Sequence, residues 1–164
     1  MKDLAEELVQ TLRHELHQYG EMLARLDQQQ EMVMCRRPDE LLQSLSDIQS
    51  QCAAIQNARG KREECQRNVA REFGLADETE LNDLLLYLPK DYRPLIKALI
   101  DENNELLVRV QQRSRQNHLL LARSLEMMQR LMDALVPGSR TVYTETGRVA
   151  VNGSAGPTLC ELVG

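Results

Sequence analysis

Apolar residues recur at alternating steps of three and four along three long stretches of the chain, residues 5–33, 41–73 and 96–131. A period of 3.5 residues places one face of a helix against its neighbours, as in coiled coils and helical bundles. Each stretch keeps this period from end to end. The pattern therefore predicts three long helices rather than strands.

Proline and glycine mark the ends of these helices. Pro38 suits the first turn of a helix, Gly74 can end one, and Pro137 with Gly138 stops the last. Asp77 and Glu80 have the spacing of a capping box and predict a short additional helix. The predicted helices are about 2–36, 38–73, 78–87 and 92–136.

The last predicted helix carries two apolar stripes. We call the first the seam stripe: Ile96, Leu99, Asn103, Leu106, Val110, Arg113, Asn117, Leu120, Ser124, Met127 and Leu131. The second stripe comprises Leu121, Leu125, Met128, Met132 and Leu135. The two stripes could face two neighbours within a bundle, or one could accept a partner helix. Methionine side chains adapt to varied apolar partners, which favours the second interpretation.

Several seam positions are polar. They are Asn103, Arg113 and Asn117 in the last helix, and Arg59 and Arg62 in the second. Polar residues at such positions usually specify register, and the alternative is a polar functional channel. Register specification is the favoured interpretation.

The composition separates a helical body from a chemically different C-terminal segment. Three of the eight glycines lie in residues 1–137 and five in residues 138–164, and aromatic residues make up only 3% of the chain. We therefore expect a helical domain over residues 1–137 and a mostly irregular tail over residues 138–164. The predicted fold is all-α, an elongated antiparallel bundle or coiled coil of three long helices and one short helix.

Charge and cysteine usage narrow the partners and the compartment. The net charge is −5 and basic residues are interleaved with acids, which argues against nucleic-acid binding. The four cysteines form no C-x-x-C pair, and the N-terminus carries acid where a signal peptide needs an apolar run. We expect a cytoplasmic protein that is a monomer or a weak homo-oligomer.

Motifs for catalysis or cofactor binding are absent from the sequence. There is no P-loop, nucleophile elbow or G-x-G-x-x-G, so we expect no enzyme, no cofactor and no small-molecule substrate. His14 and His17 could share a helical face and bind a metal, but polar surface residues are the simpler interpretation. Neither of them, nor His118, has the sequence context of a phosphorelay histidine.

Local features late in the last helix and just beyond it resemble the FlgN family. They are the run Asn117-His-Leu-Leu-Leu121, a final apolar turn ending at Val136-Pro137-Gly138, and Tyr143 followed four residues later by Gly147. In layout the resemblance covers nearly the whole chain. It implies a bacterial chaperone of flagellar type III export.

The resemblance also implies partners and sites. Such chaperones bind the amphipathic terminal helices of hook-associated (hook–filament junction) proteins, prevent their premature assembly, and deliver them to the export gate at the inner face of the membrane. On this basis the second stripe is the candidate cargo-binding site. The family associates the tyrosine after the last helix with the export gate, which corresponds to Tyr143, with Gly147 matching the family glycine.

An alternative function uses the same apolar stripes. A structural coiled-coil scaffold would associate with its own copies through these residues. The oligomeric state of the protein in solution separates the two hypotheses.

Overall fold

The computed structural model describes residues 2–35 and 37–135, which form four helices and no strand. The three long helices are α1 (Lys2–Met34), α2 (Pro38–Glu72) and α4 (Arg93–Leu135), and α3 (Leu81–Leu84) is short. The predicted all-α fold with three long helices and one short helix is confirmed. The predicted tail lies outside the described residues.

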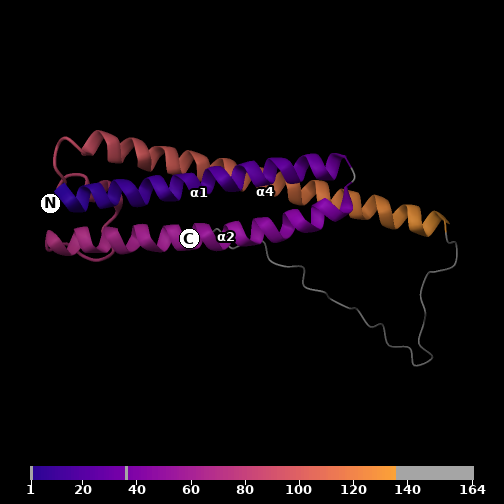
Figure 1. Cartoon of the computed structure of the whole chain (residues 1–164), viewed down its shortest axis with the longest axis horizontal. Helices are drawn as coiled ribbons and strands as arrows, with labels where there is room; N and C mark the ends of the chain where they lie inside the picture. The colour runs from indigo at the N-terminus through magenta and orange to yellow at the C-terminus, as the bar shows by residue number, and fades with distance from the viewer. Residues whose placement is uncertain (1, 36, 136–164) are drawn as a thin grey trace, which may run out of the picture.

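Consecutive long helices reverse direction, so α1 and α4 run parallel and α2 runs antiparallel to both (Figure 1). The molecule is elongated along these axes. The central helix is α1, which packs along both α2 and α4. This arrangement leaves α4 dependent on α1 for most of its helix packing.

The ends of α2 follow local chemistry. Pro38 occupies the first turn, with Asp39 and Glu40 beside it where the helix dipole favours negative charge. At the other end Gly74 has φ 67°, and the following amide of Leu75 donates to the carbonyl of Ala70 at 2.9 Å. This Schellman-type closure ends α2 and turns the chain toward α3.

The short helix α3 begins later than its sequence suggests. It starts after Glu80 without a side-chain cap, and Asp77 instead pairs with Arg71. The capping box predicted from Asp77 and Glu80 is therefore wrong, because the Asp77 carboxylate is engaged by a guanidinium. Turns continue the segment as far as Leu88.

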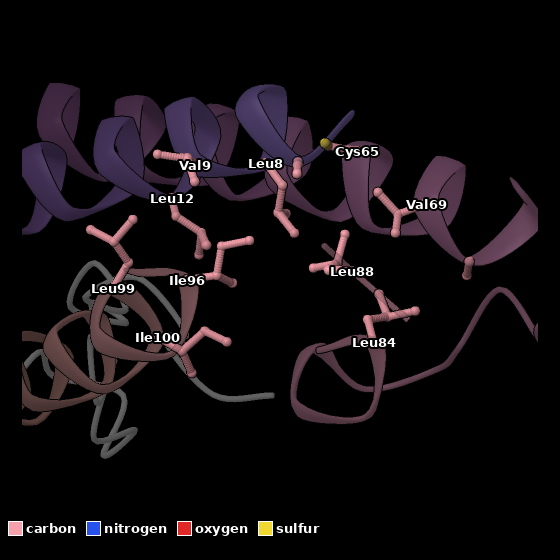
Figure 2. Packing of buried hydrophobic residues seen from close by; sticks show 12 residues of the cluster. Leu8, Val9, Leu12, Cys65, Val69, Leu84, Leu88, Ile96, Leu99 and Ile100 are labelled. Carbon is pink, nitrogen blue, oxygen red and sulfur yellow. The ribbon is translucent and has the colours of Figure 1, made fainter. Parts of the chain in front are cut away.

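The core has two apolar clusters along the bundle. At the end that holds α3, all four helices contribute, including Leu8, Val69, Leu84 and Ile96, each fully buried (Figure 2). The second cluster lies toward the α1–α2 turn and includes Met22, Ile55 and Val110. Helix α3 and Leu88 close the first end of the bundle.

Candidate functional site

The first part of α4 is held to α1 along the seam stripe. The side-chain amide of Asn117 donates to the Leu26 carbonyl at 2.7 Å and to Gln29 Oε1 at 3.1 Å. One turn earlier, Arg113 Nε lies 2.7 Å from an oxygen of Asp27. Asn117 is also the last residue of α4 that is buried. Packing against the bundle decreases after this level, because Leu120 and Leu121 are half-buried and residues 122–135 are exposed.

Beyond Leu121 every described residue of α4 is exposed. Figure 1 shows its orange end projecting past the turn that joins α1 to α2. We call residues 121–135 the overhang, a helical segment about 22 Å long at 1.5 Å per residue. Because α1 ends and α2 begins at that turn, no other described helix lies beside the far end of the overhang.

The five residues of the second stripe lie together on the overhang. Leu121 is half-buried, whereas Leu125, Met128, Met132 and Leu135 are between 61% and 79% exposed. Exposed apolar patches of this kind are uncommon on monomeric proteins and mark interaction sites. The structure thus presents the predicted cargo-binding residues on one accessible surface, with no contact that tests their role.

The seam stripe is also uncovered on the overhang, which the sequence reading missed. Met127 and Leu131 are each 56% exposed, although the seam stripe is buried against α1 farther up the helix. Neither interpretation drawn from the sequence is complete, since both stripes are exposed here. The helix lengths could have indicated this exposure, because α4 has 43 residues whereas α1 has 33 and α2 has 35.

The bundle interior holds a buried ion pair. Arg62 Nε donates to one oxygen of Glu15 at 2.7 Å, and the hydroxyl of Tyr19 donates to the other at 3.0 Å. Burial raises the pKa of Tyr19, and the Glu15 charge adds to this shift. Both carboxylate oxygens are engaged, so the arrangement stabilises the bundle rather than offering a reactive group.

A small polar cavity of about 170 Å³ adjoins this ion pair. Asn103, Leu107 and Leu81 line it from α4 and α3. The amide of Asn103 donates to the Leu12 carbonyl at 3.1 Å, while its Oδ1 is buried without a hydrogen-bond partner in the described residues. The cavity is therefore a packing defect beside a polar core residue, with room for solvent.

Register specification accounts for the buried asparagines. Asn103 bonds the carbonyl of Leu12 and Asn117 that of Leu26, and both pairs are separated by 91 residues. Equal separations mean that α1 and α4 are parallel and in one register over two heptads. Arg62 satisfies Glu15 of α1, so it also fixes neighbouring helices against each other.

The metal-binding alternative gains no support from the described residues. His14 and His17 are exposed on α1, and no group of three or more His, Cys, Asp or Glu in the described ranges could hold a metal ion. Within the same ranges no helix has a sufficiently long apolar run to cross a membrane.

Tyr143 and Gly147 lie outside the described residues, so the structure places neither of them. Their predicted contact with an export gate stays a prediction from the sequence.

Comparison with known protein families identifies a match for this chain. The family model described as FlgN protein matches residues 1–150, which is most of the chain. No curated protein and no solved structure matches it. The matched range includes the whole bundle, the overhang and the positions of Tyr143 and Gly147.

Proposed function

Because this chain belongs to the FlgN family of flagellar export chaperones, we propose that it binds hook-associated proteins before their export. In this role it keeps their terminal amphipathic helices from assembling prematurely. FlgN is a family of chaperones rather than of enzymes, which accords with the absence of catalytic motifs from the sequence.

The exposed overhang is the observation that supports this proposal. An assembly-prone helix exposes an apolar stripe, and a helix that presents a matching stripe can cover it. Each buried leucine or methionine contributes about 1.5–3 kcal/mol before the ordering costs of binding are subtracted. The exposed side chains of the overhang are enough for useful binding that can still be reversed at export.

We assign cargo binding to the second stripe. It combines leucine with the flexible, polarizable side chain of methionine, so that one surface can accept related but different helices. The residues are Leu121, Leu125, Met128, Met132 and Leu135. No nucleotide or metal is needed for this kind of binding and release.

The segment after α4 has a second role in the proposal. Tyr143 contacts the export gate, with Gly147 close to it in sequence, and the chaperone–cargo complex is thereby delivered from the cytoplasm to the inner face of the membrane. A tyrosine offers a large apolar ring with a polar end, which suits a compact contact with a second partner.

The cargo assignment is tested with the double variant Leu125→Asp plus Met132→Asp. Two charges on the stripe should weaken binding of a hook-associated protein at least about tenfold, since each burial lost costs more than the 1.4 kcal/mol that corresponds to tenfold. Calorimetry measures the affinity, and circular dichroism checks that helicity is kept.

The matched control is Ala122→Asp plus Gln129→Asp, which adds the same charge outside both stripes, also seven residues apart. It should bind cargo as the unaltered protein does. Unchanged cargo binding by the folded stripe variant would reject the second stripe as the cargo site.

Sedimentation separates the chaperone from the scaffold alternative. A chaperone forms a defined low-order complex with its cargo, whereas a scaffold forms a stable homo-oligomer that buries residues 121–135. A homo-oligomer that persists when cargo is added would favour the scaffold.

The export-gate contact is tested with Tyr143→Ala. This variant should bind cargo normally and secrete hook-associated proteins poorly. Normal secretion would remove Tyr143 from the mechanism.

A further inference from the structure

Helices α2 and α4 both pack along α1 but make almost no contact with each other. In a four-helix bundle each helix packs on two neighbours and faces the remaining helix across the diagonal. Two helices that share a neighbour without touching therefore have the arrangement of opposite corners of such a bundle. The three long helices take three corners, and the fourth corner lies between α2 and α4.

The fourth corner is filled at the closed end of the molecule. The α3 segment supplies Leu84 and Leu88, which are buried in one cluster with Val69 of α2 and Ile96 of α4 (Figure 2). Helix α3 has only four residues, however, and no other described helix follows it in this place. We call the rest of the side between α2 and α4 the open corner.

The cavity of about 170 Å³ lies at the start of the open corner. Its lining comes from every surrounding helix, including Leu12 of α1, Arg59 of α2, Leu107 of α4 and Leu81 of α3. The spaces between the helices of a bundle are common sites for ligands and partners. The cavity is larger than a single water molecule requires, so it has room for a side chain that enters from a fourth helix.

Asn103 lines this cavity with an unpaired acceptor. Its side-chain amide donates to the carbonyls of Leu12 and Leu99, while its Oδ1 is buried without a partner among the described residues. The residue is only 7% exposed. A buried acceptor is costly unless a donor reaches it, so the cavity suits a side chain that carries an N–H or O–H group.

The α4 wall of the open corner leads to the second stripe. Steps of seven residues connect Leu107 through Ser114 to Leu121 and Met128, which places them along one side of the helix. The first three are half-buried, and Met128 is 61% exposed. The second stripe therefore continues the wall that lines the cavity.

The α2 wall leads toward the same end of the bundle, because α2 runs antiparallel to α4. Steps of seven residues connect Arg59 through Cys52 to Leu45. Cys52 is buried in the cluster that contains Val110 of α4, whereas Leu45 is 43% exposed. Leu45 lies two turns from the start of α2, at the end of the bundle from which the overhang projects (Figure 1).

We infer that one amphipathic helix of the cargo occupies the open corner and completes a four-helix bundle. The helix packs on Leu45 of α2 and on the second stripe of α4, and one of its polar side chains enters the cavity and donates to Asn103 Oδ1. The inference rests on the proposed function and adds Leu45 and Asn103 to the residues that hold the cargo.

The length of the open corner favours a cargo helix over a second copy of this chain. From Asn103 to Met128 it measures about 38 Å, which corresponds to a helix of about 25 residues at 1.5 Å per residue. The overhang of a second copy is about 22 Å long, because the part of α4 before it is packed on its own α1. It would cover this length only in part.

The test measures binding of a synthetic peptide of the C-terminal helix of a hook-associated protein. The first variant is Leu45→Asp, and its control is Ser50→Asp, an exposed position roughly 140° around α2 from Leu45. The second variant is Asn103→Leu, and its control is Asn57→Leu on the exposed side of α2. Calorimetry gives the affinity, urea denaturation gives the stability, and circular dichroism checks the helices.

Leu45→Asp should weaken peptide binding about tenfold, because it places a charge in an apolar contact. Asn103→Leu should also weaken binding about tenfold, because it leaves the donor of the peptide unpaired and takes up space in the cavity. The same variant should be more stable than the unaltered protein. A loss of affinity in a more stable protein is a result that an asparagine with a purely structural role would not give.

Three outcomes would overturn the inference. Both variants could bind the peptide as the unaltered protein does while Leu125→Asp plus Met132→Asp does not, which would place the cargo on the overhang alone. Asn103→Leu alone could bind normally, which would leave the cavity as a solvent-filled defect, or a second copy could stay bound in the presence of peptide. If the unaltered protein binds neither the peptide nor the whole hook-associated protein, the proposed function itself fails.

Discussion

Buried polar residues set the alignment of the helices at the scale of single side chains. Asn103 is 7% exposed and uses its amide for two α-helical carbonyls, those of Leu12 and Leu99. Its Oδ1 lacks a partner in the described residues. An apolar side chain at this position would pack equally well and would avoid the cost of burying a polar group. The asparagine therefore contributes register at some cost in stability.

Replacing Asn103 by leucine should make the protein more stable. Asn103→Leu removes an unsatisfied buried acceptor and extends toward the adjacent cavity, so we expect the free energy of unfolding to rise by about 1 kcal/mol. Urea denaturation measures the change. The control Asn57→Leu, at an exposed position of α2, corrects for the higher helix propensity of leucine. A less stable Asn103→Leu would show that the two carbonyl bonds outweigh the orphaned acceptor.

The thiol of Cys65 makes stability sensitive to alkali. Burial, with a smaller contribution from the Glu7 charge, raises its pKa from 9.0 to about 11. Above pH 9 the unfolded chain loses this proton while the folded chain keeps it. The unfolding free energy should therefore fall between pH 9 and 11, by at most about 1.4 kcal/mol per pH unit.

The measurement is urea denaturation across this pH range for the unaltered protein and for Cys65→Ala. The variant should start less stable, because it loses buried volume, and should show a shallower pH dependence. Equal slopes for the two proteins would contradict the prediction. Tyr19, whose pKa is also raised, contributes in both proteins above pH 10.0 and so cancels in the comparison.

At the scale of elements, α4 divides into a bundled part and an exposed part. No residue of α4 after Asn117 is buried in the described chain. The free energy of unfolding of a protein truncated after Leu120 should therefore lie within about 1 kcal/mol of that of the full chain, since little packed surface is removed. The same truncation should abolish cargo binding. A large fall in thermal stability would mean that residues after 120 support the bundle.

The α3 segment closes the other end of the bundle through few residues. Leu88 is 2% exposed within the first core cluster, whereas Leu86 is 71% exposed. Leu88→Ala should cost about 2–5 kcal/mol because it leaves a cavity, and Leu86→Ala should change stability by less than about 0.5 kcal/mol. Denaturant unfolding compares them. A similar effect of both changes would argue against a sealed end.

The long helices could be predicted from sequence because their 3.5-residue period is sustained and their ends carry strong local signals, such as Pro38 and Gly74. The start of α3 could not be predicted in this way. The Asp77 carboxylate could cap a helix or pair with an arginine, and in the structure it pairs with Arg71. A periodic pattern also could not predict that Met127 and Leu131 are exposed. Periodicity shows that a face is apolar, while the register and relative lengths of the helices decide what covers it.

At the scale of the whole molecule, the closed end and the overhang lie at opposite ends of an elongated body (Figure 1). The exposed stripes should cause weak association at high protein concentration, since water disfavours a large apolar patch. Sedimentation velocity should show species larger than a monomer as concentration rises. Leu125→Asp plus Met132→Asp should reduce them, and added cargo should displace them. Association that is unchanged in this variant would place the contact elsewhere.

The hydrogen bonds of the two asparagines also determine how far α4 projects beyond the bundle. Both Asn103 and Asn117 are 91 residues from their acceptors on α1, so α4 cannot slide by one heptad without separating both asparagines from these partners. The length that projects from the bundle is thus counted from Asn117. Whole heptads inserted or deleted after this residue would change the length of the overhang and leave the bundle intact. Length variation there would be a simple route to fitting longer or shorter cargo helices.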